Sequence, residues 1–149
     1  MASISRTAHF LVCDDIRLEQ GDKHSLMGIY GTQVFVPEMP FVLPKLCFQV
    51  QVRTPIDKPV KTLQVQFTGP GKLKFEAAAT DDALRQAASD IQADSEMLIY
   101  TLTLVSAPFA IREDGQMMAI AIADGRKLPA GRVKFTLAES VKSAKTKSV

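Results

Sequence analysis

Apolar and polar residues alternate with a period of two along most of this chain. Residues 46–53 show the pattern most clearly, with apolar side chains at every second position and glutamines or an arginine at most positions between them. Successive side chains of an extended strand point to opposite faces, so this alternation predicts a strand that buries one face. The pattern recurs in several further segments separated by turns rich in glycine and proline, which predicts an all-β domain.

Residues 81–93 follow a helical period instead. Leu84, Ala87, Ala88 and Ile91 fall on one stripe, and Thr80 is a suitable N-cap. One helix among many strands does not make the repeated strand–helix alternation of a parallel α/β sheet. We therefore expect a mainly β fold, an antiparallel β-sandwich of immunoglobulin-like architecture with about 8 strands and one short helix. A small closed barrel is the alternative.

The first two predicted strands, 7–20 and 24–36, form a hairpin around the turn at residues 21–23. Gly28 and Gly31 interrupt the second strand. Glycine inside a strand often marks a bulge or a close approach of backbones, so we expect the chain to bend there.

Asp14 and the two histidines are the groups that an enzymatic alternative would use. Asp14 shares its parity with Val12 and Ile16, so we expect its carboxylate to face inward and to find hydrogen-bond partners there. An enzyme would need Asp14 beside His9 or His24 in a pocket, because general acid–base chemistry requires hydrogen-bond reach. The interpretation we favour is a structural aspartate, with no catalytic residue in the chain.

Metal and cofactor motifs are absent from the sequence. His9 precedes Cys13 by four residues, about 13 Å along a strand, too far to share one zinc ion. Cys13 and Cys47 have no CxxC spacing and are predicted to be buried thiols rather than a disulfide or zinc site. Residues 69–72 (Gly-Pro-Gly-Lys) lack the spacing of a phosphate loop and are predicted to form a hairpin turn. We therefore expect no metal and no cofactor.

The length of 149 residues suits one domain, predicted to span 1–139 and to be followed by a basic tail at 140–149. No apolar stretch approaches a membrane span or a secretory signal, so we expect a cytoplasmic protein with no membrane partner. Residues 126–149 contain seven basic residues and one acidic residue. Lys142, Lys145 and Lys147 are the predicted contacts of the tail with nucleic acid or an acidic partner, unless this tail is merely solvated.

The segment 37–44 is the first candidate for partner binding. Three prolines in eight residues forbid a helix and a central strand, while Met39, Phe41, Val42 and Leu43 are apolar. A stiff apolar loop loses little entropy on docking, which suits a protein–protein contact. Alternatively the loop crosses one end of the sandwich and caps its core.

A second candidate surface is the apolar run 97–105, together with 117–122. Both faces of these strands carry apolar residues. Such strands must be covered on both sides, by the helix or by a second subunit.

The stretch Phe10–Arg17, with Gly21, Lys23, Ser25-Leu26 and Gly28-Ile29-Tyr30-Gly31, resembles the N-terminal hairpin of a family of small uncharacterised bacterial proteins. That family is a β-rich domain of unknown function. The resemblance implies a bacterial or phage source and a single domain, and it supplies no activity, cofactor or catalytic residue.

These observations predict a non-enzymatic binding or structural module. We expect it to self-associate or to dock a protein partner through the 37–44 loop or an apolar sheet face. Binding of nucleic acid or an acidic partner through the basic C-terminal end is one alternative, and an enzyme using Asp14 with a histidine is the other.

Overall fold

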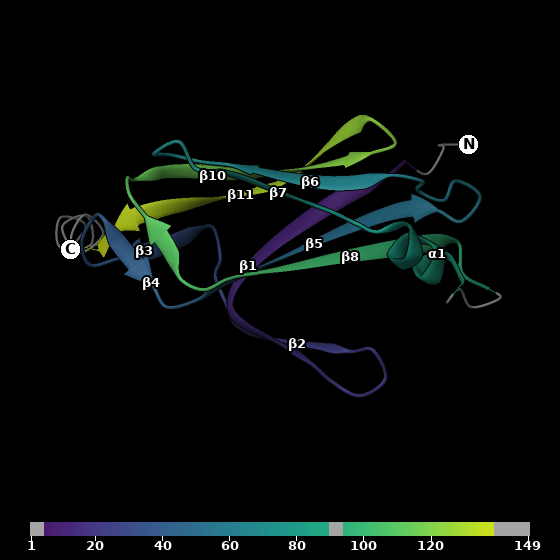
Figure 1. Ribbon diagram of the computed structural model, residues 1–149, viewed down its shortest axis with the longest axis horizontal. Coiled ribbons are helices and arrows are strands. Elements are labelled where there is room, and N and C mark those ends of the chain that lie inside the picture. Colours follow the sequence, from purple (N-terminus) through teal and green to yellow (C-terminus); the bar gives the residue numbers. More distant parts are fainter. Residues whose placement is uncertain (1–4, 90–93, 139–149) are drawn as a thin grey trace, which may run out of the picture.

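Two β-sheets stack on each other in the computed structural model, which describes residues 5–89 and 94–138 (Figure 1). The first sheet has four antiparallel strands in the order β2-β1-β5-β8. Their bounds are β1 Thr7–Leu18, β2 His24–Ile29, β5 Leu46–Pro55 and β8 Met97–Ser106.

The second sheet has five strands in the order β3-β11-β10-β6-β7. Their bounds are β3 Gln33–Val36, β6 Leu63–Thr68, β7 Lys74–Ala78, β10 Gly115–Ala123 and β11 Arg126–Leu137. All neighbours are antiparallel except β3 and β11, which run parallel, with Gln33 beside Lys134.

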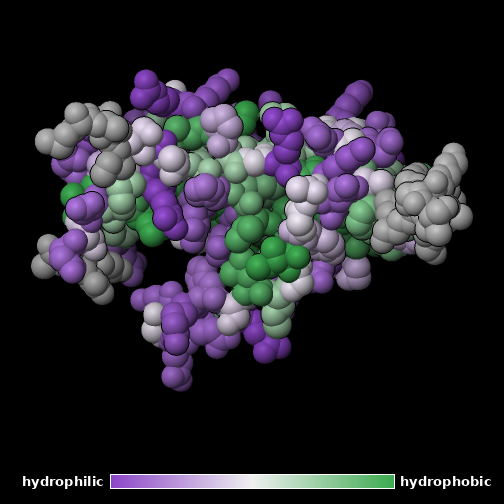
Figure 2. Space-filling model, turned by 180° about the vertical axis from the view of Figure 1, so that it is seen from behind, coloured by the Kyte–Doolittle hydropathy of each residue, from purple (hydrophilic) through white to green (hydrophobic). Residues whose placement is uncertain are grey.

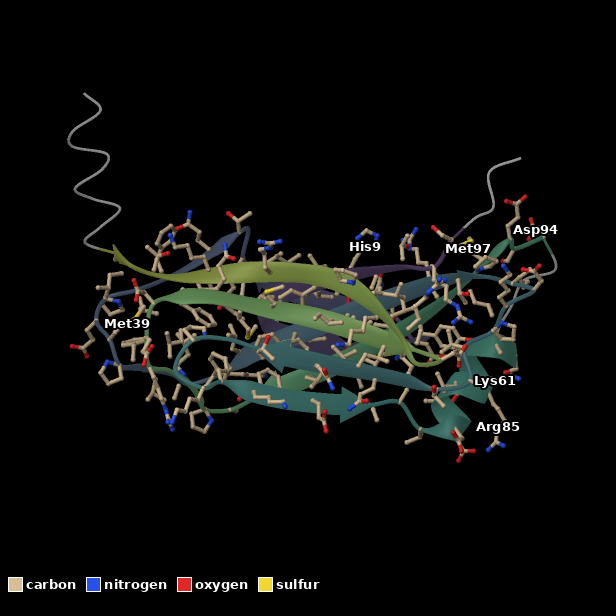
Figure 3. All side chains as sticks on the ribbon, turned by 90° about the horizontal axis from the view of Figure 1, so that it is seen from above. His9, Met39, Lys61, Arg85, Asp94 and Met97 are labelled. Atoms are coloured by element: carbon tan, nitrogen blue, oxygen red, sulfur yellow. The ribbon has the colours of Figure 1, made fainter. Side chains whose placement is uncertain are left out.

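The two ends of the sandwich are covered differently. A small ribbon of β4 (Phe41–Leu43) and β9 (Phe109–Ile111) lies at one end, and helix α1 (Asp81–Ser89) at the other. Figure 3 shows this separation, with Met39 and Arg85 at opposite ends of the molecule. The helix begins where predicted, because the Ala83 amide donates to Thr80 Oγ1 at 3.1 Å, and Leu84 anchors it in the core.

Phenylalanines hold the two sheets together. Six of them form a connected cluster whose ring centroids lie between 4.5 and 6.5 Å apart, namely Phe10, Phe48, Phe67, Phe75, Phe109 and Phe135. Tilted and offset rings at such distances favour each other beyond the area that they bury. On one side β1 comes close to β11, where a β-carbon built at Gly131 would lie 3.3 Å from that of Phe10. The side formed by β7 and β8 stays open.

The β10–β11 turn is tied to the start of β1. Both Asp124 and Gly125 have positive φ angles, 51° and 80°, as a tight hairpin turn requires. Asp124 accepts hydrogen bonds from the amides of Lys61 and Thr62 and pairs with Arg6 at 2.9 Å. Burial acts to raise the pKa of Asp124, but these donors outweigh it and hold the pKa below its ordinary value.

The predicted mainly β fold with one short helix is confirmed, with a different number of strands. The described residues contain 11 strands rather than about 8. The predicted strand 24–36 bends as expected near Gly28 and Gly31, but it is two strands, because β3 leaves the first sheet and joins the second. The segment 37–44 contains the short strand β4. Helix α1 is described as far as Ser89, so Ile91 lies outside the described residues.

Candidate functional site

The loop 37–44 mainly covers the core. Met39, Phe41 and Leu43 are partly buried and pack against the core cluster, whereas Val42 is 56% exposed. Among these four residues only Val42 therefore offers a largely exposed side chain to solvent. Partner binding by these four residues stays a prediction. The packing of Met39, Phe41 and Leu43 against the core is what we expect if the loop caps one end of the sandwich.

Asp14 does not face inward, contrary to our expectation. Its side chain is exposed, while Val12 and Cys13 are both buried. The strict alternation fails here because β1 pairs with β5 only as far as Cys13 and continues into the hairpin with β2. Tyr30 Oη donates a 2.6 Å hydrogen bond to Asp14 Oδ1. Partial burial and this carboxylate raise the pKa of Tyr30 to about 12.

Asp15 is the better-held carboxylate of the two. Lys45 donates to Asp15 Oδ1, and the Ile16 amide donates to the same atom at 3.0 Å. The lysine is the main reason why the pKa of Asp15 falls below its ordinary value. This pair ties the hairpin to the segment that leads into β5.

The two cysteines lie directly opposite each other on β1 and β5. Both are free and fully buried, as predicted. Burial raises the pKa of Cys13 to about 11 and also raises that of Cys47. At neutral pH both thiols are therefore protonated and poorly reactive.

The histidines do not join Asp14. His24 Nδ1 lies 3.2 Å from Gln49 Nε2, and the strand register places His24 four residues from the position opposite Asp14, about 13 Å along the strand. His9 is exposed on β1, five residues before Asp14. Across residues 5–89 and 94–138, no three His, Cys, Asp or Glu side chains gather as metal ligands would.

Strand β8 is an unusual edge. It spans ten residues (MLIYTLTLVS) without a charge, a proline or a glycine. The other edge strands are protected, since β7 carries Lys74 and Glu76, β2 contains a glycine, and β3 has only 4 residues. On the outward face of β8, Ile99 is 46% and Val105 is 54% exposed. The helix leaves much of the outer face of this apolar strand uncovered.

Two clefts border β8. A cleft of about 480 Å³ lies beside its C-terminal half, between β7 and the β8–β9 connection. Phenylalanines form its floor, and Lys72, Lys74 and Arg112 line it as well. We predicted only a turn at residues 69–72, and the sequence signal for a cationic site is confined to two lysines two residues apart. The arginine comes from a distant part of the chain.

The second cleft lies on the outer face of the first sheet. It measures about 910 Å³ and is bounded by the tip of the β1–β2 hairpin, by β5 and β8, and by α1. The hairpin forms a third layer beneath the sandwich in Figure 1, and Figure 2 shows it as a mostly hydrophilic arm that stands away from the body. The Gln49 side chain on the cleft floor is 5% exposed and contacts His24 from the hairpin.

The predicted tail contacts Lys142, Lys145 and Lys147 lie outside the described residues. The basic residues of β11 that are described, Arg126, Lys127, Arg132 and Lys134, are all exposed. Within the described part of the chain, no helix has the length and apolar character needed to cross a membrane.

Comparison with known proteins identifies a family. The model of the family of unknown function DUF6941 matches residues 8–138, so the chain belongs to this family, and the predicted family resemblance is confirmed. No curated protein matches. Among solved structures, superoxide reductase (neelaredoxin) from Ignicoccus hospitalis is 11% identical with a TM-score of 0.31, over 85% of this chain and 82% of that one. A variant of that enzyme gives a TM-score of 0.33 over 88% of this chain and 81% of that chain, again at 11% identity. Likeness of this degree carries no argument about activity.

Proposed function

We propose that this member of a family of unknown function is a non-enzymatic binding module that pairs with a second copy of itself along strand β8. The observation that carries the proposal is the unprotected ten-residue edge. A long apolar edge strand presents unpaired backbone donors and acceptors, and native proteins rarely leave one uncovered. A second copy covers it by continuing the four-stranded sheet.

The sequence of β8 is complementary to itself in the antiparallel direction. With Leu102 on the two-fold axis, Thr101 lies opposite Thr103 of the second copy, and Ile99 lies opposite Val105. Threonine pairs and β-branched apolar pairs are favourable across strands, and an isologous two-fold contact requires this kind of self-match. No like charges meet, because the strand has no charged residue.

The pairing fits the surroundings of the strand. Helix α1 contacts β8 and shares the second cleft with Met97, Leu98 and Ile99. In a contact centred on Leu102, Leu98 lies opposite Ser106 of the second copy, and within β8 only Met97, at the end beside α1, stays unpaired. Strand pairing alone buries less than the usual ~1,200–2,000 Å² of a stable complex, so we expect a reversible dimer at micromolar concentrations.

The packing of Met39, Phe41 and Leu43 favours β8 over the 37–44 loop as the contact surface. A cytoplasmic location accords with the two free, buried thiols, since such thiols persist in reducing compartments.

Light scattering tests the proposal at tens of micromolar protein. Wild-type protein is expected to show a dimer mass that falls on dilution. The variants Thr101→Glu/Thr103→Glu and Thr101→Lys/Thr103→Lys place like charges opposite each other and should each be monomeric. An equimolar mixture of these two variants should restore the dimer mass, which a merely damaged fold cannot do.

Thr7→Glu/Thr68→Glu is the matched control, because both threonines are exposed strand residues away from β8. It should dimerise like the wild type. A monomeric wild type, polydisperse aggregates, or a mixture that stays monomeric would reject pairing along β8.

A further inference from the structure

The cleft between β7 and β8 combines an apolar floor with a cationic rim. Phe48 and Phe109 are nearly or fully buried and pack 5.6 Å apart, and Phe75 packs against both. Leu73 and Leu104 extend this apolar lining. The volume of about 480 Å³ lies within the usual range of small-molecule sites, which are mostly apolar with a few placed polar groups.

Three cations meet at the cleft from two distant parts of the chain. Lys72 lies in the β6–β7 turn, Lys74 begins β7, and Arg112 follows β9. The turn and the arginine are in close contact, since a β-carbon built at Gly71 would lie 3.2 Å from Arg112 Cβ. None of the three forms an ion pair with a carboxylate of the described residues.

The lining of the cleft contains no carboxylate. Glu113 follows Arg112 and approaches Gly71, but it is not among the lining residues. The lining therefore contributes three positive charges and no negative one, while the apolar floor disfavours a buried charge because it cannot solvate it. An anion with an apolar body satisfies both conditions.

We propose that this cleft binds a medium-chain aliphatic carboxylate, with its hydrocarbon chain on the phenylalanine floor and its carboxylate among Lys72, Lys74 and Arg112. The head group stays at the wet mouth of the cleft, so it keeps water while it gains charge-assisted hydrogen bonds. The chain displaces water from apolar surface that the two sheets leave open. A single copy of the protein contains the whole site, so the inference does not depend on pairing along β8.

Calorimetric titration with dodecanoate tests the site in the wild type and in the Thr101→Lys/Thr103→Lys variant, which cannot pair along β8, and a micromolar Kd is expected for both. Dodecanol and dodecyltrimethylammonium have the same chain without the negative charge and should bind at least about tenfold more weakly. Lys74→Glu/Arg112→Glu should weaken dodecanoate by the same factor or more. Lys127→Glu/Arg132→Glu, an equal charge change on exposed positions of β11, should change affinity far less.

A steric pair of variants locates the ligand. Ala110→Trp places a large side chain in this cleft, whereas Ala83→Trp, on α1, places one in the second cleft. Both alanines are exposed. Only Ala110→Trp should reduce dodecanoate binding. Equal affinity for the three amphiphiles, loss of binding in Ala83→Trp alone, or no heat at millimolar dodecanoate would overturn the proposal. Binding to phosphatidylglycerol vesicles without binding of dodecanoate would also overturn it, because the surface would then recognise a lipid bilayer rather than a free carboxylate.

Discussion

Replacing Gly28 tests how the β1–β2 hairpin is held. Gly28 has a φ of 67°, and a β-carbon built there would lie 2.8 Å from Asp14 Cγ. Alanine in this left-handed backbone conformation costs about 1 kcal/mol of folding free energy relative to glycine. It must also displace the Asp14 carboxylate from Tyr30, and a charge-assisted hydrogen bond at this exposed position is worth about 1 kcal/mol. We expect Gly28→Ala to destabilise the protein by roughly 2 kcal/mol, a loss of roughly 4–8 °C in Tm.

Gly21 provides the matched control. Its φ is 75°, but nothing lies within 4 Å of a β-carbon built there. Gly21→Ala should therefore cost only the backbone strain, about 1 kcal/mol. Urea unfolding measures both losses, and an unchanged m-value shows that the unfolded state is not altered. In an Asp14→Ala background the loss for Gly28→Ala should fall towards that for Gly21→Ala, with the 3.1 Å approach to the β-carbon of residue 14 as the remaining contact. Equal losses in the presence of Asp14, or a difference that Asp14→Ala leaves unchanged, would refute this account.

Three further predictions concern stability and reactivity. The pKa of Asp124 is depressed, so its contribution to stability is present above the ordinary value near 4 and is lost as the pH falls through the folded pKa. The difference in unfolding free energy between wild type and Asp124→Asn should therefore be widest near neutral pH and should close towards pH ~2. A difference that does not change with pH would contradict this prediction. Cys13 and Cys47 should not react with a thiol reagent at neutral pH until the protein is unfolded, and rapid labelling of the native state would show that they are accessible. Phe67→Ala should cost about 3–5 kcal/mol in urea melts because Phe67 is fully buried, whereas Phe35→Ala, at 49% exposed, should cost under about 1 kcal/mol.

The period-two alternation of apolar and polar residues identified most strands, because this alternation follows directly from burial of one face of a strand. It identified β5 and β6 closely, and the helical stripe located α1. Alternation failed at Asp14, where the strand changes partners. The alternation of side chains shows which residues share one face of a strand. It cannot show where the strand stops pairing with one neighbour and continues with another.

For the same reason, the sequence does not predict which distant segments lie next to each other. The turn at residues 69–72 was predicted, yet the cation-lined cleft needs Arg112, which the fold brings to Lys72 from 40 residues away. The apolar run 97–105 was predicted to need cover on both faces. Only the strand order shows that β8 is an edge, and hence that a second copy has a free hydrogen-bonding side to occupy.

The parallel pairing of β3 with β11 has a consequence for how the chain is made. Gln33 lies beside Lys134, so β3 has to wait for about 100 further residues to be synthesised before its neighbour exists. Contacts so distant in sequence are slow to form, because the intervening chain must first be ordered. On the ribosome, the β1–β2 hairpin can form early, while β3, which follows it, has no sheet to join until β11 has been translated.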